Sequence, residues 1–187
     1  MTFFGDKIFT PRLRLRKLAK EDLALLLDWS NSDSANGDYL SADKLTKERI
    51  KDKFESGVLW SENNKTFMVE TQDGVQLGTI HYWLRSERSE CAVVKVRISV
   101  PEQRGKGYGT EAQKYLVSHL FDRLKISEVE MYTDVNNKAQ QRCLVKLGFE
   151  LVESLTYEDN QVTRYGYLFR LHSLHYQQYP IYQYHYE

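Results

Sequence analysis

The sequence predicts an α/β (α+β) fold in which a mixed, mostly antiparallel central sheet is flanked by helices. In the first half of the chain, successive strand patterns are separated only by short turns, which is typical of antiparallel pairing. In the second half, extended and helical patterns alternate, and a strand–helix–strand unit there requires a right-handed parallel crossover. With 187 residues, 41% hydrophobic and 28% charged, the chain is long enough to bury a core.

The elements of the first half follow from simple periodicities. Residues 12–18 alternate basic and apolar side chains, which predicts a half-exposed strand. A stripe of leucines from Leu23 predicts a helix, residues 31–43 are polar and turn-rich, and residues 44–54 predict a second, short helix. Three strands follow, at residues 66–71, 77–84 and 91–100, with Asp73-Gly74 as a hairpin turn.

The second half contains the clearest helix of the chain. Five side chains at helical spacing predict one buried stripe, namely Ala112, Tyr115, Leu116, His119 and Leu120. We interpret His119 as a packed core residue. Further elements are expected at residues 126–133 (strand), 137–147 (helix), 149–157 (strand) and 163–171 (strand), with a turn at Asp159-Asn160. Ala139, Cys143 and Leu147 are expected on one face of the second helix, and Gly148 is expected to end it in the left-handed conformation.

No change in composition marks a domain boundary, so we expect a single domain over residues 1–187 with an aromatic-rich tail at residues 172–187. The tail holds five of the 13 tyrosines and three of the five histidines. If it were extended, Tyr182, Tyr184 and Tyr186 would share one face. It either packs on its own domain, closes a binding site, or adds a strand at the edge of a homodimer, and packing is the interpretation we favour.

Charge and hydropathy exclude several classes of function. The formal net charge is zero, which gives no overall field for nucleic acid. No apolar run reaches about 18 residues, so no membrane span is expected, and the N-terminus lacks a signal-peptide pattern. The two cysteines, Cys91 and Cys143, have no metal-binding spacing and fit a reducing compartment as buried thiols. We therefore expect a cytoplasmic protein without a metal site.

The most informative stretch is the glycine loop, residues 100–110 (VPEQRGKGYGT), which lies between a predicted strand and the clearest helix. Glycines at alternate positions let a ligand approach the main chain closely. The free N–H groups of the first helical turn favour an anion, and Arg104 and Lys106 add positive charge. The loop therefore predicts a phosphate-bearing ligand held by backbone amides.

Several interpretations of this loop compete. A Walker A loop is excluded, because Lys106-Gly107 has no glycine at the required distance upstream. A dinucleotide fingerprint fits Gly107 to Ala112, with Glu128 or Glu130 about 20 residues on. Against it stand the four residues between the strand and the glycines and the antiparallel strands that precede them. A tight surface loop without a ligand is the remaining alternative.

The whole stretch, Arg104-x-x-Gly107-x-Gly109, matches the R/Q-x-x-G-x-G/A signature of the GCN5-related N-acetyltransferase (GNAT) family. Asn137 and the run Lys146-Leu-Gly-Phe149 resemble the second conserved block of that family at its usual spacing. The resemblance covers nearly the whole chain, because the predicted order of elements is also that of the family. It implies a GNAT-type fold.

Within the family, the chain most resembles the branch of the ribosomal-protein N-terminal acetyltransferases (RimJ/RimL-like). The opening Thr10-Pro-Arg-Leu-Arg-Leu-Arg16 is similar to the start of that branch, and so is the block Arg142-Cys-Leu-Val-Lys-Leu-Gly-Phe149. This branch also includes acetyltransferases of small amines and antibiotics, so it does not fix the substrate.

The resemblance implies acetyl-CoA as co-substrate and assigns residues to it. Its pyrophosphate would lie on the N–H groups of Gly105, Lys106, Gly107, Tyr108, Gly109 and Thr110. Its pantetheine arm would pair with the main chain of Ile98, Ser99 and Val100, where an N–H group would also hold the developing oxyanion. Arg104 and Lys106 would neutralise phosphates, unless Arg104 folds back over loop carbonyls. Asn137 would bond to the cofactor, cap a helix, or do both.

The catalytic groups are less clear, because many relatives place a tyrosine acid where this chain has Leu144. Water, Tyr132 or Cys143 could protonate the leaving thiolate instead. Glu90 and His81 are the candidate bases, with a surface charge and a satisfied strand histidine as the alternatives. Three aromatic side chains, Trp60, Tyr82 and Trp83, are candidate walls of the acceptor pocket, with core packing as their alternative. We expect residues 31–43 and 81–83 to form the wall on the acceptor side.

The function implied is transfer of an acetyl group from acetyl-CoA to a primary amine, either a small molecule or a protein N-terminus. Direct attack in a ternary complex is expected, because no Cys or Ser is arranged as a covalent nucleophile. One alternative is a non-catalytic module that binds acyl-CoA as a sensor or partner. Another is a dinucleotide-binding protein.

Overall fold

The structure is a computed structural model that describes residues 2–4 and 6–183. In this part of the chain nine strands form one sheet in the order β1-β2-β3-β4-β5-β6-β7-β9-β8. The strands are β1 (Thr2–Phe4), β2 (Lys7–Phe9), β3 (Leu13–Lys17), β4 (Asn64–Thr71), β5 (Gln76–Leu84), β6 (Cys91–Ile98), β7 (Glu128–Asp134), β8 (Glu150–Asp159) and β9 (Val162–His172). Neighbouring strands pair antiparallel except β6 and β7, which are parallel. The predicted mixed, mostly antiparallel sheet is confirmed.

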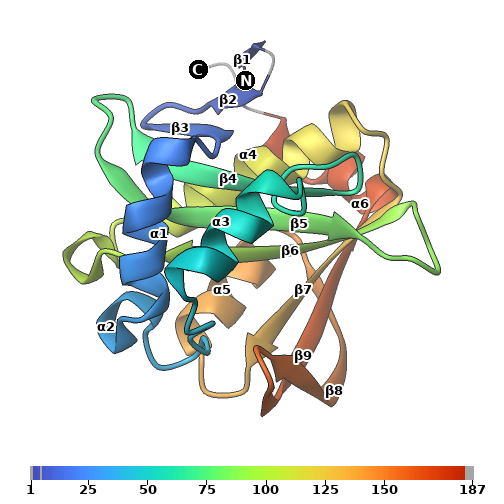
Figure 1. Ribbon diagram of the computed structural model, residues 1–187. Helices are drawn as coiled ribbons and strands as arrows, with labels where there is room; N and C mark the ends of the chain where they lie inside the picture. The colour runs from blue at the N-terminus through green and yellow to red at the C-terminus, as the bar shows by residue number, and fades with distance from the viewer. Residues whose placement is uncertain (1, 5, 184–187) are drawn as a thin grey trace.

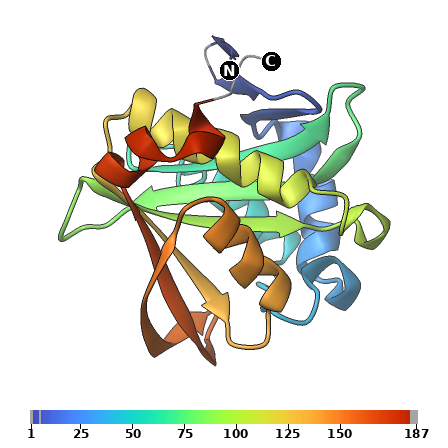
Figure 2. The same ribbon diagram turned by 180° about the vertical axis from the view of Figure 1, so that it is seen from behind.

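Helices cover both faces of the sheet. Helices α1, α2 and α3 lie on the face toward the viewer in Figure 1, and α4, α5 and α6 cover the opposite face, seen in Figure 2. Their bounds are α1 (Leu23–Ser30), α2 (Asp33–Asn36), α3 (Lys47–Glu55), α4 (Tyr108–Asp122), α5 (Lys138–Lys146) and α6 (Ser173–Gln178). Short 3-10 turns occur at η1 (Lys20–Asp22), η2 (Pro101–Gln103) and η3 (Pro180–Tyr182). Among the described residues, no helix combines the length and the apolar character needed to cross a bilayer.

The core lies between the sheet and α4. In β3 the leucines Leu13 and Leu15 are fully buried, while Arg14 and Arg16, which alternate with them, reach the other face, as the period of two predicts. The predicted stripe of α4 is buried throughout. His119 is part of this packing, and burial lowers its pKa to about 4, so the core interpretation of this residue is confirmed.

The structure differs from the sequence prediction in the first 55 residues. The hairpin β1–β2, which extends the sheet beyond β3, was not predicted, because strands of three residues show too little alternation. Helix α2 lies inside the segment predicted as turns, where the Ser32 hydroxyl accepts a hydrogen bond from Ala35 N (3.2 Å). Helix α3 begins at Lys47 instead of residue 44, because the Thr46 hydroxyl caps it.

The predicted buried face of α5 is wrong in part. Ala139 is exposed, whereas Leu144 and Leu147 are fully buried, so the face is rotated from the expected one. Gly148 ends the helical segment with φ +84°, as predicted. A Cβ at this position would lie 3.0 Å from the ring of Tyr179, which packs against the glycine.

The strand–helix–strand unit predicted after the glycine loop is β7–α5–β8. The two strands run in the same direction, but β9 lies between them and pairs antiparallel with both. The directly paired parallel strands are β6 and β7, which α4 connects.

The tail packs on its own domain through residue 183, as favoured from the sequence. Tyr176 stacks on Phe121 of α4 with ring centroids 4.6 Å apart, and the Tyr182 hydroxyl donates to Leu147 O (2.6 Å). The alternative of an extended aromatic face is wrong for Tyr182, which lies in a 3-10 turn. Tyr184 and Tyr186 fall outside the described residues.

Candidate active site

The sheet splits at its centre. Strands β6 and β7 pair only through Cys91–Val93 and Glu128–Glu130 and then diverge (Figure 1). The other edge of β6 pairs with β5 through odd-numbered residues: Ser99 N donates to Leu77 O (2.8 Å) and Cys91 O accepts from Arg85 N (2.9 Å). Main-chain groups of successive residues in an antiparallel strand point to opposite edges, so residues two apart share an edge. The main chain of Val96 therefore faces the opening between β6 and β7.

This geometry corrects the predicted pairing at residues 98–100. The N–H groups of Ser99 and Val100 both donate to Leu77 O (2.8 and 3.3 Å), and Ile98 O accepts from Arg104 Nε (2.8 Å). These groups are therefore engaged within the protein. The edge of β6 that can pair with an added extended chain lies at Val96 and the N–H of Ile98.

The glycine loop presents a row of amides at the start of α4. Gly105 and Gly107 have φ angles of +74° and +83°, and Gly107 is the N-cap of α4. The first bond of the helix is Glu111 N to Gly107 O (3.0 Å). None of the six N–H groups from Gly105 to Thr110 has an acceptor among residues 2–4 and 6–183. Such a row of N–H groups at a helix N-terminus favours an anion, so the geometry is compatible with the predicted phosphate-bearing ligand.

Arg12 holds this loop in place, a role that the sequence reasoning missed. Its Nη1 donates to Lys106 O (3.0 Å), its Nε pairs with Glu111 Oε2 (2.6 Å), and its guanidinium lies 4.5 Å from the Tyr108 ring centroid. Thr10 assists, because its hydroxyl donates to Glu111 Oε1 (2.7 Å). The Thr10-Pro-Arg12 opening of the sequence is therefore a clamp on the helix that starts at the glycine loop.

The two cations of the loop are engaged differently from the main prediction. Arg104 turns away from the phosphates, as in the alternative interpretation, but its Nη2 donates to carbonyls of α2, those of Ser34 (2.7 Å) and Ala35 (2.9 Å), and not to loop carbonyls. It therefore fastens α2 to the end of β6. Lys106 Nζ donates to the side chain of Gln103 (3.0 Å) and stays exposed.

Two adjoining cavities lie along the split. The loop cavity, about 600 Å³, is bounded by the glycine loop, the end of β6 and the start of α5. The split cavity, about 320 Å³, lies between β6, β7 and β8. Tyr39, Leu40, Val96, Asn137 and Gln140 line both. A ligand in the loop cavity can therefore meet a second ligand in the split cavity.

Tyr132 lies in the wall of the split cavity, as a candidate acid should. Its hydroxyl accepts from Arg85 Nη2 (2.5 Å), and its ring lies 5.3 Å from that of Tyr157. The same Arg85 nitrogen pairs with Glu130 (3.0 Å), which is fully buried. Arg85 thus orients the hydroxyl and is itself held by a buried carboxylate.

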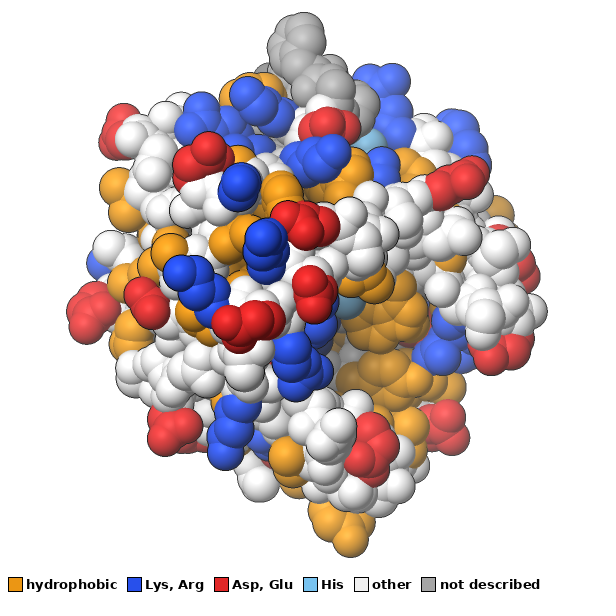
Figure 3. Space-filling model, in the orientation of Figure 1, with side chains coloured by type: hydrophobic (Ala, Val, Ile, Leu, Met, Phe, Trp, Pro, Cys, Tyr) orange, Lys and Arg blue, Asp and Glu red, His pale blue; other side chains and the backbone are white. Residues whose placement is uncertain are grey.

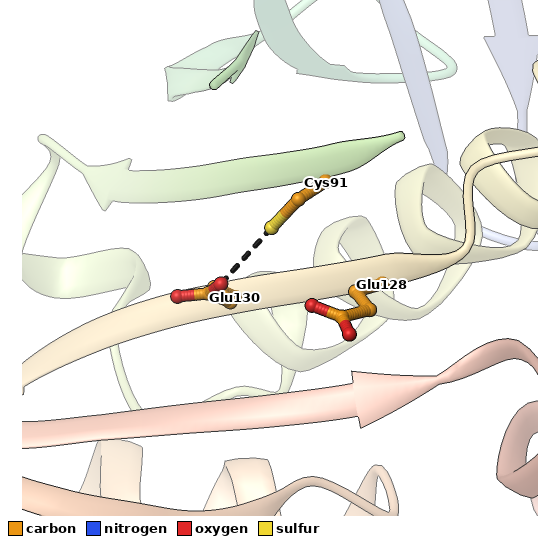
Figure 4. Close-up of side chains that lie close together, drawn as sticks. All are labelled: Cys91, Glu128 and Glu130. Atoms are coloured by element: carbon orange, nitrogen blue, oxygen red, sulfur yellow. Dashed lines mark hydrogen bonds between the residues drawn. The ribbon is translucent and has the colours of Figure 1, made fainter. Parts of the chain in front are cut away.

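Cys91, Glu128 and Glu130 lie together where β6 meets β7 (Figure 4), and their ligand-type atoms are within 4.8 Å of one another. Arginines already occupy the carboxylates: Glu130 accepts from Arg88 (2.6 Å) as well as from Arg85. The Cys91 thiol donates to Glu130 (3.0 Å), and burial, with that carboxylate, raises its pKa to about 12. These residues and the arginines form an ion-pair network that holds β6 and β7 together where they meet. Because the arginines already bond to the carboxylates, the group is poorly suited to bind a metal cation.

A second ion pair crosses the split cavity. Lys95 of β6 bonds to Asp159 at the end of β8, and Asp159 also accepts from Ser41 N (2.7 Å). Burial alone would raise the pKa of Asp159, but the Lys95 charge and these hydrogen bonds hold it below its usual value. From the sequence, Asp159 was predicted only as a turn residue.

The two candidate bases lie outside both cavity linings. Glu90 is exposed at the start of β6, where its carbonyl accepts from Ser127 N (2.9 Å). His81 bonds to Asn64 (2.9 Å), and its ring lies tilted against that of Trp83 with centroids 4.9 Å apart. Burial, with nearby Lys95 and Lys53, lowers the His81 pKa to about 4. Both positions match the structural alternatives that the sequence left open, and neither residue is part of the site that we propose.

Of the remaining predicted residues, Asn137 and Cys143 line a cavity and Leu144 belongs to the core. Asn137 caps α5 by accepting from Gln140 N (3.1 Å) and also lines both cavities. Leu144 is fully buried in the core. Burial raises the pKa of the Cys143 thiol, which lies in the loop cavity 3.2 Å from the Thr110 hydroxyl.

Of the predicted aromatic walls, only Trp83 lines a cavity. Tyr82 is fully buried, and Trp60 packs edge-on against Phe67. Tyr39 from the segment 31–43 is a further wall, which agrees with the predicted place of the acceptor side.

A mixed sheet that splits beside a glycine-rich helix N-terminus defines an acetyltransferase of GNAT type. The model of the acetyltransferase (GNAT) domain matches residues 12–150, so the chain belongs to the GNAT family. Acetyl-CoA is the acetyl donor of this family.

Individual proteins support the same class. A mycothiol acetyltransferase from Kytococcus sedentarius is 31% identical over 120 residues, which are 64% of this chain and 38% of that protein. The chain thus spans less than half the length of this curated relative.

Solved structures show the fold. The RimL ribosomal L7/L12 α-N-protein acetyltransferase in complex with coenzyme A has a TM-score of 0.73 and 13% identity, over 87% of this chain and 95% of that chain. The aminoglycoside acetyltransferase AAC(6')-Ib in complex with coenzyme A has a TM-score of 0.74 and 19% identity, over 89% of this chain and 98% of that chain.

Proposed function

We propose that this chain, as one acetyltransferase domain, transfers the acetyl group of acetyl-CoA to a primary amine by direct attack in a ternary complex. The single observation that supports this best is the row of six N–H groups at the start of α4, which have no acceptor within the described part of the chain and lie next to the open edge of β6. The pyrophosphate would accept from the N–H groups of Gly105 to Thr110. The glycines leave room for it: a Cβ at Gly105 would meet no atom within 4 Å.

The pantetheine arm would run along the free edge of β6. Val96 would pair with it through its main chain, since none of the described strands pairs with that edge beyond the β6–β7 junction. The N–H of Val96 is also the donor that we assign to the developing oxyanion. Asn137 lines both cavities and would bond to the arm with the amide nitrogen that its capping role leaves unused.

Acetyl-CoA supplies an activated carbonyl carbon and a thiolate leaving group. Tyr132 would donate its hydroxyl proton to the leaving sulfur, and Arg85 would stabilise the phenolate until solvent, which takes up the proton of the amine, returns one. Direct attack by the amine, without a covalent cysteine intermediate, agrees with the environment of the two cysteines. Burial raises the pKa of both Cys91 and Cys143, so neither thiol is a ready nucleophile.

A non-catalytic acyl-CoA-binding module is the second candidate. The observation that favours it is Leu144, a buried apolar side chain where many relatives carry a tyrosine acid. We drop the dinucleotide alternative, because the strand before the loop pairs antiparallel with β5 and the chain belongs to the GNAT family.

Release of the CoA thiol over a panel of amines tests the proposal. Enzyme-dependent, saturable release with at least one amine supports acetyl transfer. Tight binding of acetyl-CoA without release for any amine would instead support the binding module.

A further inference from the structure

The split cavity is lined chiefly by aromatic and aliphatic side chains. Four rings come from four different parts of the chain: Tyr39, Trp83 of β5, Tyr132 of β7 and Tyr157 of β8. The same lining includes Val94 and Met131. In Figure 3 this face is hollowed near the divergence of β6 and β7, and hydrophobic side chains cover the floor of the hollow. A pocket of this kind binds an apolar or aromatic body.

The charges of the cavity are already paired. Lys95 bonds to Asp159, Arg85 to Glu130 (3.0 Å), and Asp134 to Arg164 (3.2 Å). Glu158 is the one lining carboxylate without a cation partner among the described residues, and it is exposed and accepts from Thr163. The cavity therefore offers little uncompensated negative charge for the additional ammonium groups of a polyamine or an aminoglycoside.

A fastened segment limits the length of an acceptor. We name Asn36–Ser41 the strap: it carries Tyr39 and Leu40, which line both cavities. The Ser41 main chain donates to Asp159 (2.7 Å) and accepts from Asn160 (2.8 Å), and its hydroxyl accepts from Arg164 (3.1 Å). A peptide leaving the cavity between the strap and the β8–β9 turn would have to break these bonds.

We propose that the acceptor is a compact monoamine with an aromatic or apolar body, held between the rings of Trp83, Tyr132 and Tyr157 with its nitrogen toward Val96. This inference rests on the proposed function, since it names the acceptor class of the same site. The rings contact the body of the acceptor, and an ammonium entering the cavity meets ring faces before it loses its proton.

The test compares kcat/KM, measured by CoA-thiol release, for tryptamine, phenylethylamine, isobutylamine, spermidine, kanamycin and a peptide with a free N-terminus. We expect the two arylalkylamines to exceed spermidine, kanamycin and the peptide by at least about tenfold. A preference for one of these three overturns the acceptor class while leaving the proposed function intact. If acetyl-CoA binds but no amine is turned over, both the acceptor class and the proposed function are overturned. If acetyl-CoA does not bind, the proposed function is overturned, and the acceptor class, which rests on it, is overturned with it.

Two cavity variants sharpen the test. Trp83→Leu should lower kcat/KM for tryptamine by about tenfold and change that for isobutylamine by less than about threefold. Tyr39→Ala on the strap should also lower kcat/KM for tryptamine more than that for isobutylamine. Tyr39 is only partly buried, so this change removes no core side chain. Trp29→Leu on α1, outside both linings, is the matched control and should leave the ratio of the two amines unchanged. Each variant is checked for an unchanged acetyl-CoA thermal shift, and equal losses for both amines in Trp83→Leu would overturn the proposal.

Discussion

Arg12 and Glu111, 99 positions apart in the chain, form an ion pair with Nε and Oε2 2.6 Å apart directly beside the glycine loop. Glu111 lies in the first turn of α4, close to the amides that we assign to the pyrophosphate. An uncompensated carboxylate there would repel that anion. Arg12 removes the repulsion and at the same time holds Lys106 O, so it both neutralises and shapes the anion site.

Arg12→Ala should therefore weaken acetyl-CoA binding by about tenfold, the effect of losing roughly one charge-assisted hydrogen bond at the loop. Stability should change little, because Arg12 is nearly half exposed. Titration calorimetry with acetyl-CoA measures the effect, and Arg49→Ala on the exposed face of α3 is the control. An Arg12→Ala protein with unchanged affinity would show that the clamp does not shape the binding loop.

Gly107→Val should reduce acetyl-CoA affinity by more than about 100-fold while the protein stays folded. Its φ of +83° disfavours any side chain, and a Cβ would lie 3.3 Å from Arg12 Nη2. Gly57 provides the control, since its φ is +76° and its position lies outside both cavities. Gly57→Val should suffer comparable backbone strain of about 1–2 kcal/mol without a loss of affinity. Equal acetyl-CoA affinity in the two variants would refute the loop assignment.

Tyr132→Phe should lower kcat by about 10²-fold or more and leave the affinity for acetyl-CoA unchanged, because it removes one hydroxyl that acts only in the reaction. Steady-state kinetics and calorimetry separate the two effects. Tyr165→Phe, on a ring that is 71% exposed, is the matched control. If kcat survives in Tyr132→Phe, the proton for the leaving thiolate comes from water.

Asp159 predicts a pH dependence of stability. In the folded protein the pKa of Asp159 is held below its ordinary value of 3.8. The contribution of Asp159 to the free energy of unfolding is therefore fully present above about pH 4 and is lost as the pH falls through the pKa of the folded state. Asp159→Asn should cost about 2 kcal/mol at pH 7, less than a fully buried pair because Lys95 is partly exposed. The difference between the two proteins should begin to shrink below about pH 4 and should vanish as the pH falls past the folded pKa of Asp159, as measured by urea unfolding. A constant difference from pH 7 to pH 3 would contradict the ion pair.

The sequence predicted the parts of the molecule that depend on local pattern. The alternation around Leu13 and Leu15 predicted the strand, and the apolar stripe predicted the buried face of α4. Gly105 and Gly107 adopt the left-handed conformations that the glycine loop allows, and the anion site proposed for that loop stays a prediction. Such features need only periodicity and the conformational freedom of glycine. The order of elements that these patterns predict is also that of the family.

Features that depend on contacts between distant segments could not be predicted in this way. Nothing local to Arg12 points to Glu111, and nothing at Asp159 points to Lys95 or Ser41, since these partners meet only after the sheet has formed. The assignment to Ser99 and Val100 failed for a related reason. Which alternate amides of β6 remain free depends on its register with β5, which a single sequence does not specify.

The central claim is that the glycine loop and the open edge of β6 bind acetyl-CoA. Thermal unfolding with increasing acetyl-CoA, beside a parallel series with a nicotinamide dinucleotide, tests this claim most directly. We expect Tm to rise with acetyl-CoA alone, in proportion to the logarithm of its concentration above Kd and corresponding to about 2.7 kcal/mol at 100 times Kd, and no comparable rise in the Gly107→Val protein. A rise with the dinucleotide but not with acetyl-CoA, or an equal rise in Gly107→Val, would contradict the account.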